Sequence, residues 1–294
     1  MITYVFPNLS TMKQRGNIDS RKSKAEYINK LFNNDDFKIV EIPADFIKNQ
    51  TEETKTGLLP CSFLDNNTVQ KLYDKSFIKS DYILHTEPEL YRPKCSKRTM
   101  PNLNWYDETW LNNFINHVFS IIDYFEQLPY AIEIHPGLAQ NGKNNYKAYT
   151  NAIKFIFNSF VEKYNRRPLI LIENRTNSFI KSGDDISNFW NIFQNLAPEL
   201  VNNVGIILDI QQLFTSCKLD LKNQIDKIPS DSIKGFHIHR LHRTPKKDDG
   251  IDWEYVSHKI KQVENEKIIV LLLEVHREED LIRSYKFCKE FLKL

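Results

Sequence analysis

Several common sequence signals are missing from this 294-residue chain. Its four cysteines (Cys61, Cys95, Cys217 and Cys288) are far apart and form no C-x-x-C pair, so we expect reduced thiols and not a disulfide framework. No apolar run approaches the ~20 residues of a membrane span. The first ten residues, MITYVFPNLS, lack the basic segment and long apolar stretch of a signal peptide. We therefore expect a soluble, cytoplasmic protein without a membrane partner.

A strong charge imbalance is also absent. The formal net charge is +2, so the overall field demands no polyanionic partner, although local basic loops could still bind one. The chain is 41% hydrophobic and 27% charged, which is typical of a globular protein with a sizeable core.

Eight short apolar runs are spread along the sequence. They are rich in Ile, Val and Leu and nearly continuous in hydrophobicity, as are parallel strands that are covered on both faces. The runs occupy residues 2–6, 37–43, 81–86, 130–137, 168–174, 204–210, 234–239 and 267–275.

Amphipathic helical patterns separate these runs, for example SKAEYINKLFN, YTNAIKFIFNSFVEKY and DWEYVSHKIKQVE. Eight strand–helix units without a Pro/Gly/Ser-rich linker predict one single-domain (β/α)8 TIM barrel over residues 1–294, the size that this fold commonly has. An open doubly wound sheet is the alternative, but no G-x-G-x-x-G follows the first run. Residues 44–80 are expected to hold two short helices and a long loop.

Polar residues end six consecutive runs. In a (β/α)8 barrel the chemistry lies at the carboxyl ends of the strands, so this register predicts that the six side chains meet. They are His85, His135, Glu173, Asp209, His237 or His239, and Glu274.

Crowding these groups together would cost several kcal/mol unless a divalent cation compensated their charge. Imidazole and carboxylate ligands without thiolate suit Zn, Mn, Fe or Co, and we expect zinc or manganese. Six ligands are too many for one tetrahedral ion but suit two ions that share a carboxylate.

The ordered motifs ILHTEP, EIHPG, LILIENRT, VGIILDIQQLF, KGFHIHR and IIVLLLEV resemble those of the xylose-isomerase-like TIM barrels, and most closely the endonuclease IV type of AP endonucleases (family 2). The resemblance covers most of the chain from residue 81 onward. It implies one metal on His85, His135 and a bridging Glu173, and a second on Glu173, Asp209, His237 and Glu274.

The third metal of that family lacks its ligands here. The family's D-x-x-H is replaced by DIQQ, with Gln212 in place of the histidine. The further D-x-H is missing from RTPKKDDGIDW, which offers only Asp248 and Asp249.

The resemblance implies a two-metal hydrolase that cleaves a phosphodiester in damaged or modified nucleic acid, as in DNA repair. Glu173, Glu274 and His239 are its expected catalytic residues. UV damage endonuclease is a further relative with similar motifs.

Two other functions stay open. A metal-dependent isomerase or epimerase of a small sugar or sugar phosphate would need one ion, on Glu173, Asp209, His237 and Glu274, with two of the carboxylates as acid and base. A catalytically silent binding protein on the same barrel is the third possibility.

Basic loops bear on the substrate. RPKCSKR (92–98) and RLHRTPKK (240–247) follow strand ends, where cations could hold the phosphates of a nucleic acid or of a sugar phosphate. The expected substrate-binding residues are Arg175, Arg240, Arg243, Gln212 and Trp105, the last by stacking on a base.

Overall fold

The computed structural model describes residues 1–7, 18–44, 46–47, 81–86, 90–91, 103–140 and 145–294. Most of the segment 44–80, predicted to hold two short helices and a long loop, lies outside these ranges. Cys61, Cys95 and the basic run 92–98 lie outside them too. In the described part, Cys217 and Cys288 are free thiols. No described helix is both long and apolar enough to cross a bilayer.

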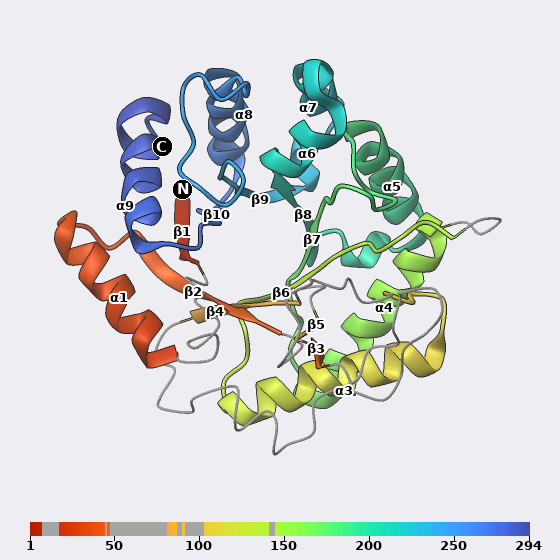
Figure 1. The fold of residues 1–294 in the computed structure, drawn as a ribbon. Coiled ribbons are helices and arrows are strands. Elements are labelled where there is room, and N and C mark those ends of the chain that lie inside the picture. Colours follow the sequence, from red (N-terminus) through yellow and green to blue (C-terminus); the bar gives the residue numbers. More distant parts are fainter. Residues whose placement is uncertain (8–17, 45, 48–80, 87–89, 92–102, 141–144) are drawn as a thin grey trace.

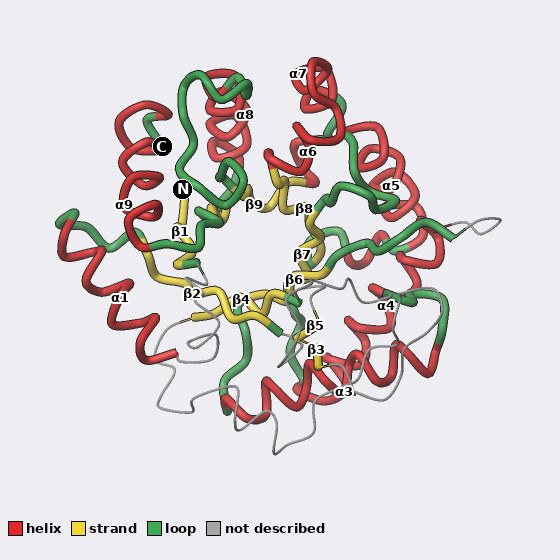
Figure 2. The backbone as a smooth tube through the Cα atoms, in the orientation of Figure 1, coloured by secondary structure: helices red, strands yellow, loops and turns green. Residues whose placement is uncertain are grey.

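Eight parallel strands form a closed barrel, which confirms the predicted fold class (Figures 1 and 2). The order around the barrel is β1-β10-β9-β8-β7-β6-β4-β2. The strands are β1 (Ile2–Phe6), β2 (Phe37–Pro43), β4 (Asp81–His85), β6 (Ala131–Ile134), β7 (Ile170–Glu173), β8 (Val204–Asp209), β9 (Ile233–His237) and β10 (Ile269–Leu272). Each one falls within or at the edge of a run that the sequence predicted.

Helices surround the ring of strands (Figure 2). They are α1 (Ile18–Leu31), α3 (Glu108–Phe125), α4 (Asn145–Tyr164), α5 (Gly183–Leu196), α6 (Ile210–Cys217), α7 (Leu221–Asp226), α8 (Trp253–Glu266) and α9 (Glu278–Lys286), which continues as a π-helix over Phe287–Leu292. Two short strands, β3 (Phe46–Ile47) and β5 (Leu90–Tyr91), pair in parallel outside the barrel.

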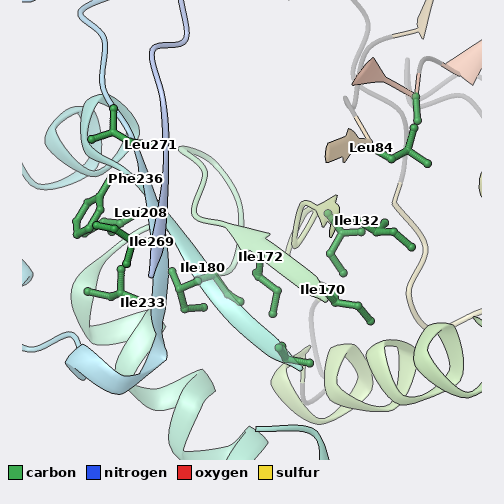
Figure 3. Close-up of a cluster of buried hydrophobic side chains, with 14 of the residues drawn as sticks. Leu84, Ile132, Ile170, Ile172, Ile180, Leu208, Ile233, Phe236, Ile269 and Leu271 are labelled. Carbon is green, nitrogen blue, oxygen red and sulfur yellow. The ribbon is translucent and has the colours of Figure 1, made fainter. Parts of the chain in front are cut away.

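Side chains alternate between the two faces of each strand. The outward set packs under the helices, and Figure 3 shows part of it, including Leu84, Ile132, Ile172, Leu208 and Leu271. The inward set forms a separate apolar cluster, which we call the inner layer. It consists of Val5, Ile39, Ile83, Ala131, Leu171, Ile207, Val270 and Leu272. These residues fill the barrel, so that its interior is a packed core.

Gly235 is the inward position of β9 at this level, where the inner layer leaves no room for a side chain. A Cβ added there would lie 2.4 Å from the carbonyl oxygen of Val270 and 2.7 Å from Cδ1 of Ile207. The neighbouring strands can approach β9 this closely only because the residue is glycine.

We expect Gly235→Ala to lower the free energy of unfolding by about 3 kcal/mol, because the clash is with backbone that a closed barrel holds in place. Gly250→Ala is the comparison, since its added Cβ meets only Phe214 at 3.4 Å but its φ is +92°. That variant should lose only about 1 kcal/mol. Urea melts measure both, and an equal loss would show that the inner layer adapts to the added methyl group.

Candidate metal centre

Seven charged or imidazole side chains cover the carboxyl end of the inner layer. Each lies two residues after an inward-facing residue, so each also points into the barrel. They are Glu41, His85, Glu133, Glu173, Asp209, His237 and Glu274. Six of them are at most 4% exposed, and the Glu274 side chain is 17% exposed. His135, two residues after Glu133, joins the same cluster and is also buried.

The structure thus brings together all six ligands predicted from the strand ends. It also adds Glu41 and Glu133, which the sequence reasoning missed because both lie inside apolar runs, in FKIVEIP and YAIEIHPG. A signal was present, since a lone carboxylate inside a buried strand needs a partner.

Two imidazoles and one carboxylate converge on one side of the barrel. His85 Nε2 and His135 Nε2 are 3.5 Å apart and lie 3.3 Å and 2.9 Å from Glu173 Oε2. On the opposite edges of the rings, His85 Nδ1 lies 2.7 Å from Glu41 Oε1 and His135 Nδ1 lies 3.0 Å from the carbonyl oxygen of Thr86. Both Nδ1 atoms therefore carry hydrogen, and the lone pairs of neutral rings face each other at Nε2.

This arrangement needs a positive charge between the two Nε2 atoms, either a proton or a metal ion. Burial lowers the pKa of His135, which keeps that ring neutral. Burial also lowers the pKa of His85, but Glu133, Glu173 and Glu41 more than offset it, and the pKa stands well above its usual value. Without metal, His85 holds the compensating proton.

A second set of ligand atoms surrounds His237. His237 Nδ1 lies 3.7 Å from both Glu173 Oε2 and Glu274 Oε2 and has no hydrogen-bond partner among the described residues. Ligand atoms of Asp209, His237 and Glu274 all lie within 4.8 Å of one another. On the other side of the ring, Nε2 lies 3.1 Å from Glu133 Oε1. Glu133 thus faces the outer edge of the His237 ring at ion-pair distance, whereas Glu41 forms a hydrogen bond with His85.

These donors fit a divalent cation. Ligands at about 2.1 Å from one ion lie about 3.0–3.4 Å from each other. The atoms of His85, His135 and Glu173 are 2.9 to 3.5 Å apart, and His237 Nδ1 is 3.7 Å from its two carboxylates. Carboxylate oxygens and imidazole nitrogens without sulfur suit manganese, iron, cobalt or zinc. The unpartnered Nδ1 of His237, which points between two carboxylates, is the atom that most directly indicates a cation.

Two of the three carboxylates around His237 are held in the ionised form. Burial raises the pKa of Glu173, but His135 and His237 more than reverse this and hold it well below its usual value. Burial also raises the pKa of Glu274, but the neighbouring histidines lower it by more, so that it stands well below its usual value. These histidines are His239, His237 and His242. Burial is the dominant influence on Asp209 and raises its pKa. A bound cation would favour the ionised form of all three carboxylates.

His239 supports the carboxylates. Its Nε2 lies 3.2 Å from Asp209 Oδ2 and 3.1 Å from Glu274 Oε2, while its Nδ1 accepts the backbone N–H of His242 at 3.0 Å. Nε2 thus faces the two carboxylates and Nδ1 faces the backbone N–H, so neither nitrogen of His239 offers a free lone pair to a metal. His239 and His242 can therefore join Glu274 in a metal site only if this backbone contact breaks.

The backbone N–H group of His242 lies in a strained turn. Leu241 (φ 52°) and His242 (φ 54°) are both left-handed, and Arg240 and Arg243 exchange backbone hydrogen bonds of 3.0 Å across them. Such a turn favours Asn-Gly, so two ordinary residues here cost about 1–2 kcal/mol each. The turn also stacks the His242 ring on His239 and on His276, with ring centroids 4.8 Å and 4.5 Å apart.

Several predicted substrate contacts have other partners. Trp105 is only 2% exposed and donates from Nε1 to the His135 carbonyl at 3.1 Å, so it offers no face for stacking on a base. Arg240 donates to Gln211 Oε1 at 2.7 Å and to the Asp249 carbonyl at 3.1 Å. Arg243 pairs with Asp280 at 3.2 Å. Trp105 and these two arginines thus hold loops in place. Substrate contact by Arg240 and Arg243 stays a prediction, and the Arg243 side chain is 51% exposed.

Gln212 and Arg175 stay at the mouth of the barrel. Gln212 Oε1 accepts the hydroxyl and backbone N–H of Thr176 at 2.6 Å and 3.2 Å, which orients the amide and leaves its NH2 group to donate. Asp249, considered as a ligand for a third metal, instead accepts from Lys246 N and Trp253 Nε1 within its own loop.

The metal-free protein should be most stable near pH 6.5. Burial lowers the pKa of His117 to about 3, so below pH 6.5 the unfolded chain binds a proton that the folded chain rejects. The pKa values of His85 and His237 are raised, despite burial, by carboxylates, chiefly Glu133. Above pH 6.5 their contribution is progressively lost, by about 1.4 kcal/mol per pH unit for each histidine.

Urea melts of EDTA-treated protein between pH 5 and 9 test this. A saturating divalent cation should remove the alkaline decline, because the ion takes the place of those protons. Constant stability of the metal-free protein from pH 6.5 to 8.5 would contradict the proposed protonation of His85 and His237.

No protein-family model and no curated protein matches this chain. Solved structures do match it. The D-psicose 3-epimerase of Clostridium cellulolyticum H10, determined with D-tagatose, has a TM-score of 0.56 at 13% identity and covers 99% of this chain and 97% of its own. The 3-keto-D-glucoside 4-epimerase of E. coli in its apo form has a TM-score of 0.56 at 13% identity, covering 99% and 98%.

A xylose isomerase domain protein from Alicyclobacillus acidocaldarius is similar too, with a TM-score of 0.54 at 13% identity, covering 99% and 98% of the two chains. At these identities the likeness shows the fold alone, a closed (β/α)8 barrel.

The comparisons overturn the prediction of a nucleic-acid hydrolase. The matched structures named above are sugar epimerases and a xylose isomerase domain protein, and a special closeness to endonuclease IV is not shown. The features that suggested nucleic acid do not support it either. Trp105 is buried, Arg243 is paired, and the basic run 92–98 lies outside the described residues.

Proposed function

We propose that this chain is a divalent-metal-dependent isomerase or epimerase of a small sugar. The observation that carries the proposal is the position of two ionised carboxylates, Glu173 and Glu274, each 3.7 Å from His237 Nδ1. With Asp209 they complete the one-ion ligand set that the resemblance implies for the sugar isomerases. The structural neighbours that act on sugars support the same function.

The reaction would move a proton at a carbon next to a carbonyl group. A bound divalent cation would polarise the substrate oxygens and so acidify that proton. Glu173 and Glu274 act as base and acid, one removing the proton and the other returning one. Their lowered pKa values keep both ionised at neutral pH, so either can accept the substrate proton at the start. The other carboxylate must first take up a proton from water or from a substrate hydroxyl group before it can return one to the carbon.

The other buried groups orient this pair. His239 donates from Nε2 toward Asp209 and Glu274 and limits the rotation of both carboxylates. Glu133 fixes the ring of His237 from the other side. His85 and His135 converge on Glu173, where they contact the substrate in a one-ion enzyme or hold a second ion in a two-ion enzyme.

Proton exchange in D2O tests this proposal. The Mn2+-loaded protein should catalyse exchange of the hydrogen next to the carbonyl group of a ketose, with formation of an epimer or aldose, both visible by NMR. Glu173→Gln and Glu274→Gln should each reduce the rate by about 10²- to 10⁴-fold, the usual contribution of a general acid or base.

Glu162→Gln, the same change on the exposed face of α4, is the control and should have wild-type activity. The proposal fails if no ketose or aldose exchanges a proton with the metal-loaded protein. It also fails if both active-site variants exchange as fast as the control.

A further inference from the structure

Arg175 is a cation at the mouth of the barrel that forms no ion pair within the described part of the chain. It lies two residues after Glu173 at the end of β7, and its side chain is partly buried. Among the described residues, its guanidinium group makes no ion pair and no hydrogen bond. The other two arginines predicted to lie at the mouth are both occupied, Arg240 by Gln211 and Asp249, and Arg243 by Asp280.

The guanidinium group lies close to the buried cluster. Its positive charge acts on His135, whose pKa is lowered first by burial and further by Arg175 and His85. Arg175 therefore lies on the side of the centre formed by β6 and β7, next to the imidazole that faces Glu173 Oε2 at 2.9 Å.

The backbone around Arg175 is held rigidly. Arg175 N donates to the Ile180 carbonyl at 3.0 Å, and Ser178 Oγ donates to the Arg175 carbonyl at 2.7 Å. The loop is tied to the segments that follow the two neighbouring strands. Phe179 N donates to the carbonyl of Gly137, after β6, and the Thr176 hydroxyl donates to Oε1 of Gln212 in α6. The base of the side chain is thus fixed before any ligand binds, which reduces the entropy lost on binding.

A partly buried guanidinium group with unused donors is costly unless a ligand satisfies it. Its planar fork matches the oxygens of a phosphate or carboxylate group, which it can bind through two parallel hydrogen bonds. A neutral sugar offers only hydroxyl groups, whose hydrogen bonds with a guanidinium group are weaker than those of an anion.

We propose that Arg175 binds an anionic substituent of the substrate, a phosphate or a carboxylate group, so that the preferred substrate is a charged sugar. This inference rests on the proposed isomerase or epimerase function and specifies its substrate class. Arg175 would hold the anionic end while the carbonyl end lies between Glu173 and Glu274.

Turnover of three substrate classes tests the inference: neutral ketoses, ketose phosphates and keto sugar acids. The Mn2+-loaded wild-type protein should prefer one of the charged classes, and which class it prefers separates a phosphate ligand from a carboxylate ligand. Arg175→Gln should reduce kcat/KM for that class by about 10- to 100-fold, mainly through KM, and change kcat/KM for neutral ketoses less than about 3-fold.

Arg166→Gln is the matched control, because it removes the same charge from the exposed loop between α4 and β7, at the opposite end of the barrel. It should behave as wild type with all three classes. Equal turnover of neutral and charged sugars by wild type and Arg175→Gln would overturn the anion subsite and leave the isomerase proposal intact.

Binding of inorganic phosphate to the Mn2+-loaded protein gives a readout that needs no turnover. The wild-type protein and Arg166→Gln should bind phosphate about 10-fold or more tightly than Arg175→Gln. If that difference holds while no sugar reacts, the anion subsite stands and the proposed reaction fails. If phosphate binds equally to all three proteins, the subsite is refuted.

Discussion

The two-residue repeat of the strands in a closed parallel barrel is the constraint on which the rest depends. Each strand that places an apolar residue in the inner layer must point its next inward side chain into the space above that layer. Ile83 is followed by His85, Leu171 by Glu173, and Ile207 by Asp209. One register therefore fills the core and assembles the polar cluster. Gly235 keeps β9 close enough for His237 to join it.

Charge compensation governs the chemistry of that cluster. Five carboxylates converge in a largely buried space, together with imidazoles that carry no charge in their singly protonated form. The carboxylates are Glu41, Glu133, Glu173, Asp209 and Glu274. Protons on His85 and His237 can balance part of this charge, and a divalent cation can balance it better with the same donor atoms. The outer carboxylates Glu41 and Glu133 turn the imidazoles so that their lone pairs face inward. We therefore expect a divalent cation to displace the protons of His85 and His237 when it binds to this centre.

The sequence predicted the barrel and the meeting of the strand-end residues because both follow from local patterns, the apolar runs and their register. Contacts made by loops could not be predicted in this way. Trp105 and Arg243 were expected to bind substrate, but tertiary packing places the first in the core and pairs the second with Asp280. The orientation of His239 depends on a left-handed turn at Leu241 and His242, which nothing in those residue types indicates. The nucleic-acid substrate was inferred from a resemblance, and the structural neighbours named above are instead sugar epimerases and a xylose isomerase domain protein.

The central claim is that the cluster binds a divalent cation through the set around His237, and titration calorimetry of EDTA-treated protein with Mn2+ at pH 7.5 tests it most directly. The account predicts at least one tight site per chain, weakened about 100-fold or more in Asp209→Asn and unchanged in Asp248→Asn, an exposed acid of the loop after β9. Absence of stoichiometric binding, or equal affinity in both variants, would contradict it.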